Sequence, residues 1–241
     1  MKTLLLQNIN KERGEIQEEA WSAYMGMCRY AWWNNEKIKI KKIKVEDLKH
    51  DNLKSIPVGS VSFVKKYMDL HQIKIPQITY DHPFFLKQIK IITFKDLKTL
   101  NYPLFIKPIK LKSLNGEVYE SYSQALDNIQ YTNMNMEDEF YVNENIYDFE
   151  SEHRIYVHNM KVKSICRYQG NIWSSQPDKK TIETFIMDCK YKTYSFDVGF
   201  DKISQTWIPI EINDFWSLGN YGMNHEDYYL AIRDRWEEIV K

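Results

Sequence analysis

The chain has 241 residues and carries 33 basic and 33 acidic side chains, so its formal net charge is zero. A hydrophobic fraction of 43% and a charged fraction of 27% indicate a globular protein with ample core, and exclude a disordered or fibrous chain. Zero net charge removes the general attraction to nucleic acid and to anionic membranes that a strongly basic protein has.

The cysteines and the apolar runs indicate the compartment. Cys28, Cys166 and Cys189 are an odd number of widely spaced residues without a CxxC motif, which favours free thiols over a disulfide framework or a zinc site. The apolar run at residues 3–6 is too short for a signal peptide, and no run of about 18 apolar residues occurs. We therefore expect a cytoplasmic protein without a membrane segment.

The first part of the chain has the pattern of a small α/β region that ends at a soft boundary between residues 85 and 100. Strand-like alternation and helical spacing follow one another in it, interrupted by a turn that contains Pro57. We expect, in chain order, a strand at 3–6, a helix between 14 and 27, a strand at 38–45, a turn at 57–60 and a helix in SFVKKYMDL.

The strand IKIKKIKV at residues 38–45 has two interpretations. Its alternation predicts an exposed or edge strand with the lysines turned outward. The alternative is a basic stripe for RNA, and the zero net charge of the chain argues against it. The lysines concerned are Lys39, Lys41, Lys42 and Lys44.

From about residue 88 the pattern changes to longer strands with helices between them. The strands are expected at 104–108, 139–146, 154–157, 162–168, 194–200 and 207–213, and the helices at 123–129, 176–190 and 225–240. The strands on either side of residues 158–160 should pair antiparallel, and Asp178 lies near a helix start, where a carboxylate meets unpaired amides. This order favours the α+β class, with one region at 1–90 and a second domain at 91–241.

Two of these strands carry oxygen-bearing side chains on one face. In YSFDVGF the aromatic residues alternate with Asp197, and in WIPIEIN three isoleucines share one face while Glu211 and Asn213 share the other. A hairpin of the two strands would place Asp197 beside Glu211 and Asn213, and such a set suits Mg²⁺ with room for phosphate oxygens. The alternative is an ordinary half-buried edge strand with a solvated polar face.

Two lysines near the strand LFIKP are candidates for phosphate contacts. Lys107 is a lone cation on an otherwise apolar strand, where an unpaired buried charge would be costly. Lys112 follows in the loop at 110–119, which contains Asn115-Gly116 and is suited to closing over phosphates. The alternative is that both lysines are surface residues whose stems pack on apolar side chains.

The aromatic loop at residues 214–221 follows the second metal-facing strand. It either caps the core or lines a substrate site, and its place next to strand-borne ligands favours the substrate site. The patterns GxxxxGK[ST], GxGxxG, HExxH and GxSxG do not occur. Their absence excludes the commonest phosphate-loop, dinucleotide, zincin and serine-hydrolase readings.

The order of these parts resembles the ATP-grasp superfamily. The parts are FIKP, a small loop, the strand YVNENI, an E-x-R motif, a second arginine, an aspartate and an E-x-N motif. SEHRIYV, SFDVGF, EINDFWSLGNYG and RDRW are most similar to the clade named for one arginine and two lysines, which is common in bacteriophages. The resemblance covers residues 55–241. It implies an ATP-grasp fold, in which two α+β subdomains grip ATP, preceded by a small α/β pre-ATP-grasp region.

The resemblance implies a role for each matching residue. Lys107 would contact the α-phosphate and adenine side of ATP, and Lys112 the β- and γ-phosphates. Glu152 matches a ribose-binding residue, and Arg154 and Arg167 match arginines that face the transferred phosphoryl group or the acceptor carboxylate. A hinge strand would meet adenine through its backbone, and a set of oxygen ligands would hold Mg²⁺. The hinge is Val142, Asn143, Glu144, Asn145 and Ile146, and the metal ligands are Asp197, Glu211 and Asn213.

The activity implied is an ATP- and Mg²⁺-dependent ligase that joins a carboxylate to an amine through an acyl phosphate. Phosphoryl transfer depends on charge neutralisation and alignment, which metals, lysines and arginines provide. Its partners would be a small-molecule or peptide carboxylate and an amine, with no nucleic acid or membrane, in the host cytoplasm if a bacteriophage encodes it. The alternative is a catalytically quiet nucleotide-binding protein that acts through a protein partner, for instance in counter-defence; the intact metal set and both lysines argue against it.

Overall fold

The computed structural model describes residues 3–10, 15–51, 55–76, 89–109, 116–130, 134–186 and 191–241. Helices and strands are interspersed throughout this part of the chain, so the predicted α+β class is confirmed. The chain divides into two compact units. The first comprises Met1–Thr79, Glu150–Phe200 and Trp207–Lys241, and the second comprises Tyr80–Phe149 and Asp201–Thr206. The predicted boundary at residue 90 separates functional regions and does not coincide with these compact units. It remains a prediction.

The N-terminal part of the first unit is a four-stranded sheet built around β1 (Thr3–Asn10). β1 pairs in parallel with β3 (Ile40–Ile43) and β4 (Ser55–Val58), and antiparallel with β2 (Glu15–Ile16). Helix α1 (Glu18–Asn34) connects β2 to β3, and α2 (Val61–Leu70) follows β4. Parallel strands joined through helices make this the expected small α/β region.

Two local expectations for this region are wrong. The first half of the turn predicted at residues 57–60 is strand, because β4 runs from Ser55 to Val58 and is buried throughout, and the chain bends only at Gly59. Pro57 is tolerated there because β4 has β1 as its one neighbour in the described sheet, and an edge strand does not need every N–H. Helix α2 begins after Ser60, whose Oγ accepts a hydrogen bond from the Phe63 N–H at 3.3 Å.

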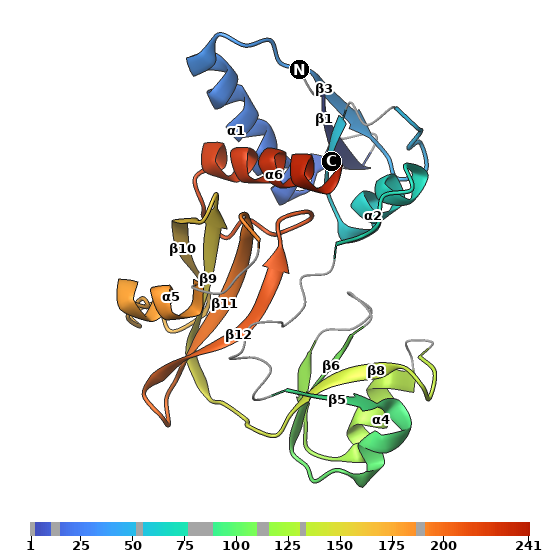
Figure 1. The fold of residues 1–241 in the computed structure, drawn as a ribbon, viewed down its shortest axis with the longest axis vertical. Coiled ribbons are helices and arrows are strands. Elements are labelled where there is room, and N and C mark those ends of the chain that lie inside the picture. Colours follow the sequence, from blue (N-terminus) through green and yellow to red (C-terminus); the bar gives the residue numbers. More distant parts are fainter. Residues whose placement is uncertain are drawn as a thin grey trace. The chain divides into compact units, whose positions relative to one another are not determined.

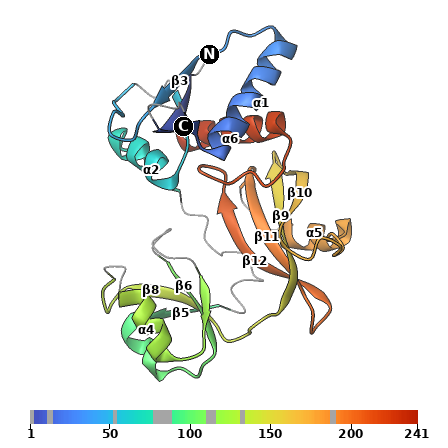
Figure 2. The ribbon, with the colours of Figure 1, turned by 180° about the vertical axis from the view of Figure 1, so that it is seen from behind.

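Helix α1 continues to Asn34 instead of ending near residue 27. Its Gly26 is a packing position and not a stop. A Cβ at Gly26 would lie 1.9 Å from the carbonyl oxygen of His225, at the start of α6 (His225–Ile239). The glycine therefore lets the first and last helices of the unit approach closely, and both views show them side by side (Figures 1 and 2).

The C-terminal part of the first unit is a sheet in the order β10-β9-β11-β12. Its strands are β9 (Phe149–His158), β10 (Lys161–Gly170), β11 (Tyr194–Asp201) and β12 (Thr206–Asp214). β9 and β10 form the predicted antiparallel pair. Helix α5 (Lys179–Ile186) begins three residues later than expected, and residues 187–190 of the expected helix lie outside the described residues. Asp178 caps the helix by accepting the Thr181 N–H at 2.7 Å.

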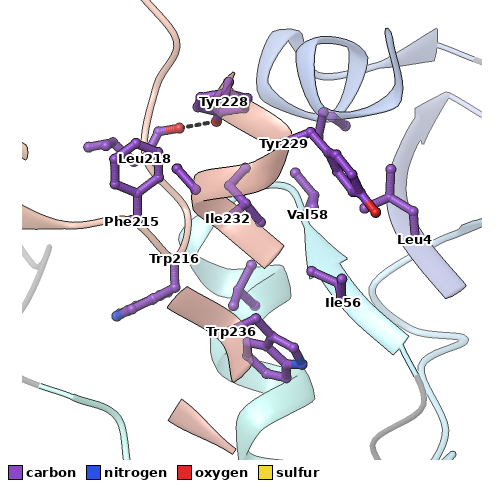
Figure 3. Packing of buried hydrophobic residues seen from close by; sticks show 14 of the residues in the cluster. Leu4, Ile56, Val58, Phe215, Trp216, Leu218, Tyr228, Tyr229, Ile232 and Trp236 are labelled. Carbon is purple, nitrogen blue, oxygen red and sulfur yellow. Dashed lines mark hydrogen bonds between the residues drawn. The ribbon is translucent and has the colours of Figure 1, made fainter. Parts of the chain in front are cut away.

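The two faces of this sheet have different neighbours. On one face, Phe196 and Val198 of β11 pack with Ile155 of β9 and with Ile182 of α5. On the other face, Tyr156 joins a core that continues into the N-terminal sheet and α6. Figure 3 shows that core, in which the Tyr228 hydroxyl donates to the carbonyl oxygen of Leu218. Its labelled members are Leu4, Ile56, Val58, Phe215, Trp216, Leu218, Tyr228, Tyr229, Ile232 and Trp236.

The second unit is a sheet in the order β5-β8-β6-β7, with helix α4 packed on it (Figure 1). The elements are β5 (Lys90–Thr93), the 3-10 helix η1 (Phe94–Thr99), β6 (Leu104–Pro108), β7 (Glu117–Tyr119), α4 (Tyr122–Gln130) and β8 (Glu139–Asn143). Ala125 and Ile129 of α4 pack against Ile106 and Phe140. Strand β7 lies in a segment that was expected to be a loop.

No helix in the described residues is both long enough and apolar enough to cross a membrane. Cys28 and Cys166 are free thiols, and Cys189 lies outside the described residues.

Candidate functional site

The structure brings Asp197, Glu211 and Asn213 together on one face of the C-terminal sheet. β11 and β12 are neighbours in the sheet and consecutive in the chain. The Asn213 Nδ2 donates to Glu211 Oε1 at 2.8 Å and lies 3.5 Å from Asp197 Oδ2. The hairpin therefore places the Asn213 amide within contact of both carboxylates.

Arg154 joins this cluster through Asp197. It lies on β9, the other neighbour of β11, and its Nε and Nη2 each donate to the Asp197 carboxylate at 2.7 Å. Nη2 is also 4.0 Å from Glu211 Oε1. The pair is buried, with Arg154 7% and Asp197 2% exposed. Two parallel charge-assisted hydrogen bonds of this kind fix both the position and the orientation of the guanidinium.

Burial and charge act in opposite directions on this pair. Burial raises the pKa of Asp197 to about 6, and the neighbouring Glu211 and Glu152 act in the same direction, although Arg154 lowers it. Burial alone would lower the pKa of Arg154. The hydrogen bonds and charge of Asp197 outweigh burial, so the arginine pKa is raised above its ordinary value. The pair is therefore ionised at neutral pH, and Asp197 is the partner that changes its charge when the pH falls.

Aromatic residues complete the surroundings of Arg154. Its Cζ lies 4.7 Å from the ring centroid of Tyr221 and 5.7 Å from that of Tyr168. The Tyr168 hydroxyl donates to Glu152 Oε2 at 2.6 Å, which brings the predicted ribose-binding residue to the same face. A sequence-based search misses Tyr168, because its neighbourhood with Arg154 depends on the register of β9 and β10, which the sequence does not reveal.

The two halves of the aromatic loop after β12 have different surroundings, and a substrate-lining role for the loop remains a prediction. Phe215, Trp216 and Leu218 are buried in the core, so this half caps it. Tyr221 is 46% exposed and lies beside Arg154. The second half of the loop is therefore part of the surroundings of the cluster.

Arg167 is not brought to the cluster. In the antiparallel ladder Cys166 is opposite Arg154 and Arg167 is opposite His153. Directly opposed residues share a face, so Arg167 and His153 lie on the other side of the sheet. The Arg167 Nη1 donates to the carbonyl oxygen of Gly170 at 2.9 Å. A catalytic role for Arg167 remains a prediction without support from this geometry.

The remaining predicted contacts belong to the second unit. Lys107 alternates with the buried Leu104, Ile106 and Pro108 and lies on the half-exposed side of β6. A Cβ at Gly116 would meet the Phe105 ring at 2.4 Å, so only glycine lets β7 begin so close to β6. Lys112 lies outside the described residues.

The predicted hinge lies at and after the end of β8. Val142 is buried, and its backbone pairs with Ile106 on one side and Lys90 on the other. The strand ends at Asn143, not at residue 146. The Asn143 Oδ1 accepts the Asn145 N–H at 2.9 Å, Glu144 accepts from Lys90 at 2.6 Å, and Ile146 is 36% exposed. Adenine contacts by these residues remain a prediction.

The sequence matches the family model of the ATP-grasp domain, R2K clade family 2, over residues 84–231. The chain belongs to this ATP-grasp family. The predicted superfamily is thereby confirmed, while an origin in a bacteriophage remains a prediction. Among curated proteins, none matches the sequence.

Solved structures agree with the ATP-grasp fold. The chain is similar to D-alanyl-alanine synthetase A from Vibrio cholerae, with a TM-score of 0.57 and 10% identity over 98% of this chain and 99% of that one. It is also similar to a RimK domain protein ATP-grasp from Sphaerobacter thermophilus, with a TM-score of 0.53 and 10% identity over 100% of both chains. At this identity the likeness concerns the fold alone.

The cluster of this ATP-grasp chain has a donor set that fits Mg²⁺. Hard divalent cations take carboxylate and amide oxygens, which Asp197, Glu211 and Asn213 provide on adjacent strands. In the described residues, no three His, Cys, Asp or Glu side chains are arranged to hold a metal ion. The amide oxygen of Asn213 is therefore needed to complete the set, and turning its amide would direct that oxygen to the carboxylates.

A cavity of about 390 Å³ adjoins the aromatic loop on the side of α1. Glu18, Ser22 and Arg29 of α1 and Asn220 and His225 near the start of α6 contribute to its lining. Its volume lies in the range of sites for small molecules, roughly 300–1,000 Å³.

Proposed function

We propose that this ATP-grasp chain is an ATP- and Mg²⁺-dependent ligase that joins a carboxylate to an amine. The observation that carries the proposal is the placement of Asp197, Glu211 and Asn213 on one face of adjacent strands, with Arg154 held among them by Asp197. Membership of the ATP-grasp family supports ATP as the phosphoryl donor. The shared fold of a D-alanyl-alanine synthetase is consistent with ligation.

The reaction that suits this site passes through an acyl phosphate. An oxygen of the substrate carboxylate attacks the γ-phosphorus of ATP, the bond from that phosphorus to the β,γ-bridging oxygen breaks, and ADP leaves. The amine then attacks the acyl carbon, the carbon–oxygen bond to phosphate breaks, and the nitrogen loses a proton. Both steps are accelerated by alignment and by cationic groups beside the charge that develops on oxygen.

The chain supplies that environment from several residues. Arg154 provides a fixed cation, and Glu152 on the same face is proposed to bind the ribose. Lys107 and Lys112 are proposed to contact the phosphates, and residues 142–146 the adenine. Mg²⁺ held by Asp197, Glu211 and Asn213 would neutralise charge on phosphate oxygens.

We place the acceptor next to the second half of the aromatic loop. The cavity there carries a carboxylate, a guanidinium, a hydroxyl and amide groups on its lining, which suit an amine or the end of a peptide. A peptide or protein end is therefore the acceptor class that we propose to test first.

Trapping of the acyl phosphate tests the proposal. The protein is incubated with ATP, Mg²⁺, hydroxylamine and pools of amino acids, peptides and other carboxylates. We expect a hydroxamate to form with one of the pools, together with an equal amount of ADP, and neither product with the Glu211→Gln variant. Formation of AMP and pyrophosphate would contradict the acyl-phosphate route. ATP binding seen as a raised melting temperature, without turnover in any pool, would favour the quiet nucleotide-binding alternative.

A further inference from the structure

Tyr168 and Tyr221 form a stacked pair of rings against the Arg154 guanidinium. Their centroids are 5.1 Å apart with an interplanar angle of 28°, and both lie within 6 Å of the Arg154 Cζ. A guanidinium at this distance from aromatic rings is attracted by the ring quadrupole. The arginine is thus restrained by Asp197 at its edge and by the rings as well.

The two rings are held by groups other than Arg154. Tyr168 is fixed by its hydrogen bond to Glu152 at 2.6 Å. Tyr221 is fixed through its backbone, because its N–H donates to the Tyr156 hydroxyl at 3.0 Å and that hydroxyl donates to the Gly219 carbonyl at 2.7 Å. Tyr156 lies two residues from Arg154 on the same face of β9. One strand therefore carries both the arginine and the tyrosine that holds the backbone of Tyr221.

The turn that carries Tyr221 is closed by its own residues. The Asn220 Oδ1 accepts the Gly222 N–H at 3.2 Å, and its Nδ2 donates to the Met223 carbonyl at 3.1 Å. Gly222 has a φ of +111°, which side chains other than hydrogen rarely permit. The backbone position of Tyr221 is therefore set by the turn itself.

One nitrogen of Arg154 is left for another partner. Nε and Nη2 are engaged by Asp197, while Nη1 donates to no acceptor among the residues that the structure describes. Because Asp197 holds the Nε–Nη2 edge of Arg154 and the two tyrosine rings lie against the guanidinium, Nη1 has a defined position. A mobile arginine would have to be ordered at each turnover, at a cost in conformational entropy.

We propose that Tyr221, supported by Tyr168, is a positioning residue for Arg154. The rings keep the guanidinium in the plane in which it grips Asp197 and so fix the direction of Nη1. That an anionic group of the reactants is received at Nη1 rests on the proposed function, whereas the positioning itself does not. The role requires an aromatic ring at residue 221 and does not require its hydroxyl.

Nitrogen-15 NMR of the arginine side chains tests the positioning directly. The Nε–H signal of Arg154 is assigned by its loss in Arg154→Lys, and its exchange with water is measured in wild type, Tyr221→Ala and Tyr221→Phe. We expect Tyr221→Ala to speed exchange about tenfold, which corresponds to about 1.4 kcal/mol. Tyr221→Phe should stay within about twofold of wild type. Unchanged exchange in Tyr221→Ala, or an equal increase in Tyr221→Phe, would overturn the proposal.

A matched pair of residues elsewhere in the first unit provides the control. Arg233 lies with its Cζ 5.3 Å from the Tyr30 ring, away from the cluster. Tyr30→Ala should alter the Arg233 signal and leave that of Arg154 unchanged. If Tyr30→Ala also sped exchange at Arg154, the effect would be a general loosening and the proposal would fall.

Turnover separates this proposal from the proposed function. With an identified acceptor, Tyr221→Ala should lower kcat for ADP formation about tenfold with less than a threefold change in KM for ATP, and Tyr221→Phe should recover most of kcat. Absence of ATP turnover in wild type would refute the proposed function, and the NMR result would still decide the positioning. A larger effect of Tyr221→Ala on KM than on kcat would assign Tyr221 to ATP binding and refute the positioning role.

Discussion

His153 and Arg154 are consecutive residues of β9, but they lie on opposite faces of the sheet and meet different conditions. His153 is 1% exposed and packs edge-on against Trp207, with ring centroids 5.3 Å apart. Neither of its ring nitrogens has a hydrogen-bond partner among the described residues. Burial, helped by the charge of Arg167, lowers its pKa to about 4. Arg154 is also buried, but it keeps its charge through Asp197.

The difference shows two ways to bury an ionisable group. A histidine can give up its proton and be buried as a neutral ring, whereas an arginine cannot and needs a carboxylate. The face with α5 is therefore apolar at these positions, whereas the face with Arg154 keeps a buried ion pair that the proposed phosphoryl transfer would use. Substitutions on the two faces should consequently separate stability from activity.

The largest effect is expected when one member of the buried pair is removed. Arg154→Ala leaves Asp197 buried without its cation, which should lower the free energy of unfolding by about 3–5 kcal/mol and abolish turnover. The double variant Arg154→Met/Asp197→Leu should recover most of the stability but none of the activity. Urea denaturation and ADP formation measure the two effects. Wild-type stability of Arg154→Ala would contradict the pairing.

A similar loss of stability without a loss of activity per folded molecule is expected on the other face. Phe196 is 2% exposed in the cluster with α5, so Phe196→Ala should cost about 3–5 kcal/mol. The ADP formed per folded molecule should remain near wild type below the melting temperature. A loss of turnover beyond the loss of folded protein would show that the faces are not independent.

Substitutions of the proposed metal ligands should reduce activity strongly and change stability little. Glu211→Gln and Asn213→Ala should reduce Mg²⁺-dependent turnover by at least about 10–100-fold, because even residues behind a metal ligand have effects of that size. Melting temperatures without Mg²⁺ should change little, since both side chains are partly exposed. Turnover like that of wild type in Glu211→Gln would remove the proposed metal role.

The pH dependence of stability should reveal His153. The unfolded chain takes up a proton at His153 near pH 6.5, whereas the folded chain does so only near pH 4. The unfolded state therefore binds more protons between these values, and the contribution of His153 to stability falls as the pH is lowered from 6.5 to 4. His153→Phe should show a smaller loss of melting temperature across this window. Parallel curves for the two proteins would contradict a neutral buried His153.

The smallest effect is expected at Arg167. It lies on the face away from Asp197, so Arg167→Ala should change the free energy of unfolding by less than about 0.5 kcal/mol and turnover by less than about threefold. A 100-fold loss of turnover would instead support the catalytic role that the family resemblance assigns to it. Comparison with Arg154→Ala under the same conditions makes the difference between the two arginines measurable.

The sequence was sufficient where contacts join strands that are consecutive in the chain. Period-two alternation predicted the buried aromatic face of β11, and the hairpin with β12 brought Asp197 to Glu211. The Arg154–Asp197 pair was not predictable, because β9 and β11 are separated in the chain by β10 and α5. The face of Arg167 depends on the register of β9 and β10, which alternation alone does not set.

The alternation of β12 also predicted more burial than the structure shows. Ile210 was expected on a buried face, yet it is only partly buried, while Pro209 on the polar side is buried. β12 is the last strand of its sheet, where cover by other elements is incomplete. At an edge, side-chain chemistry alone does not tell which face is covered.

The close approach at Gly26 has a consequence for how this chain can be recombined with its relatives. Residues 1–79 share a unit with the final helix, and Tyr228, Ile232 and Trp236 of that helix are buried in the core that both build. A polypeptide shortened to residues 91–241 would expose these side chains and be prone to aggregate. Exchange of the N-terminal region between homologues should therefore give a folded protein only when α6 is exchanged together with it.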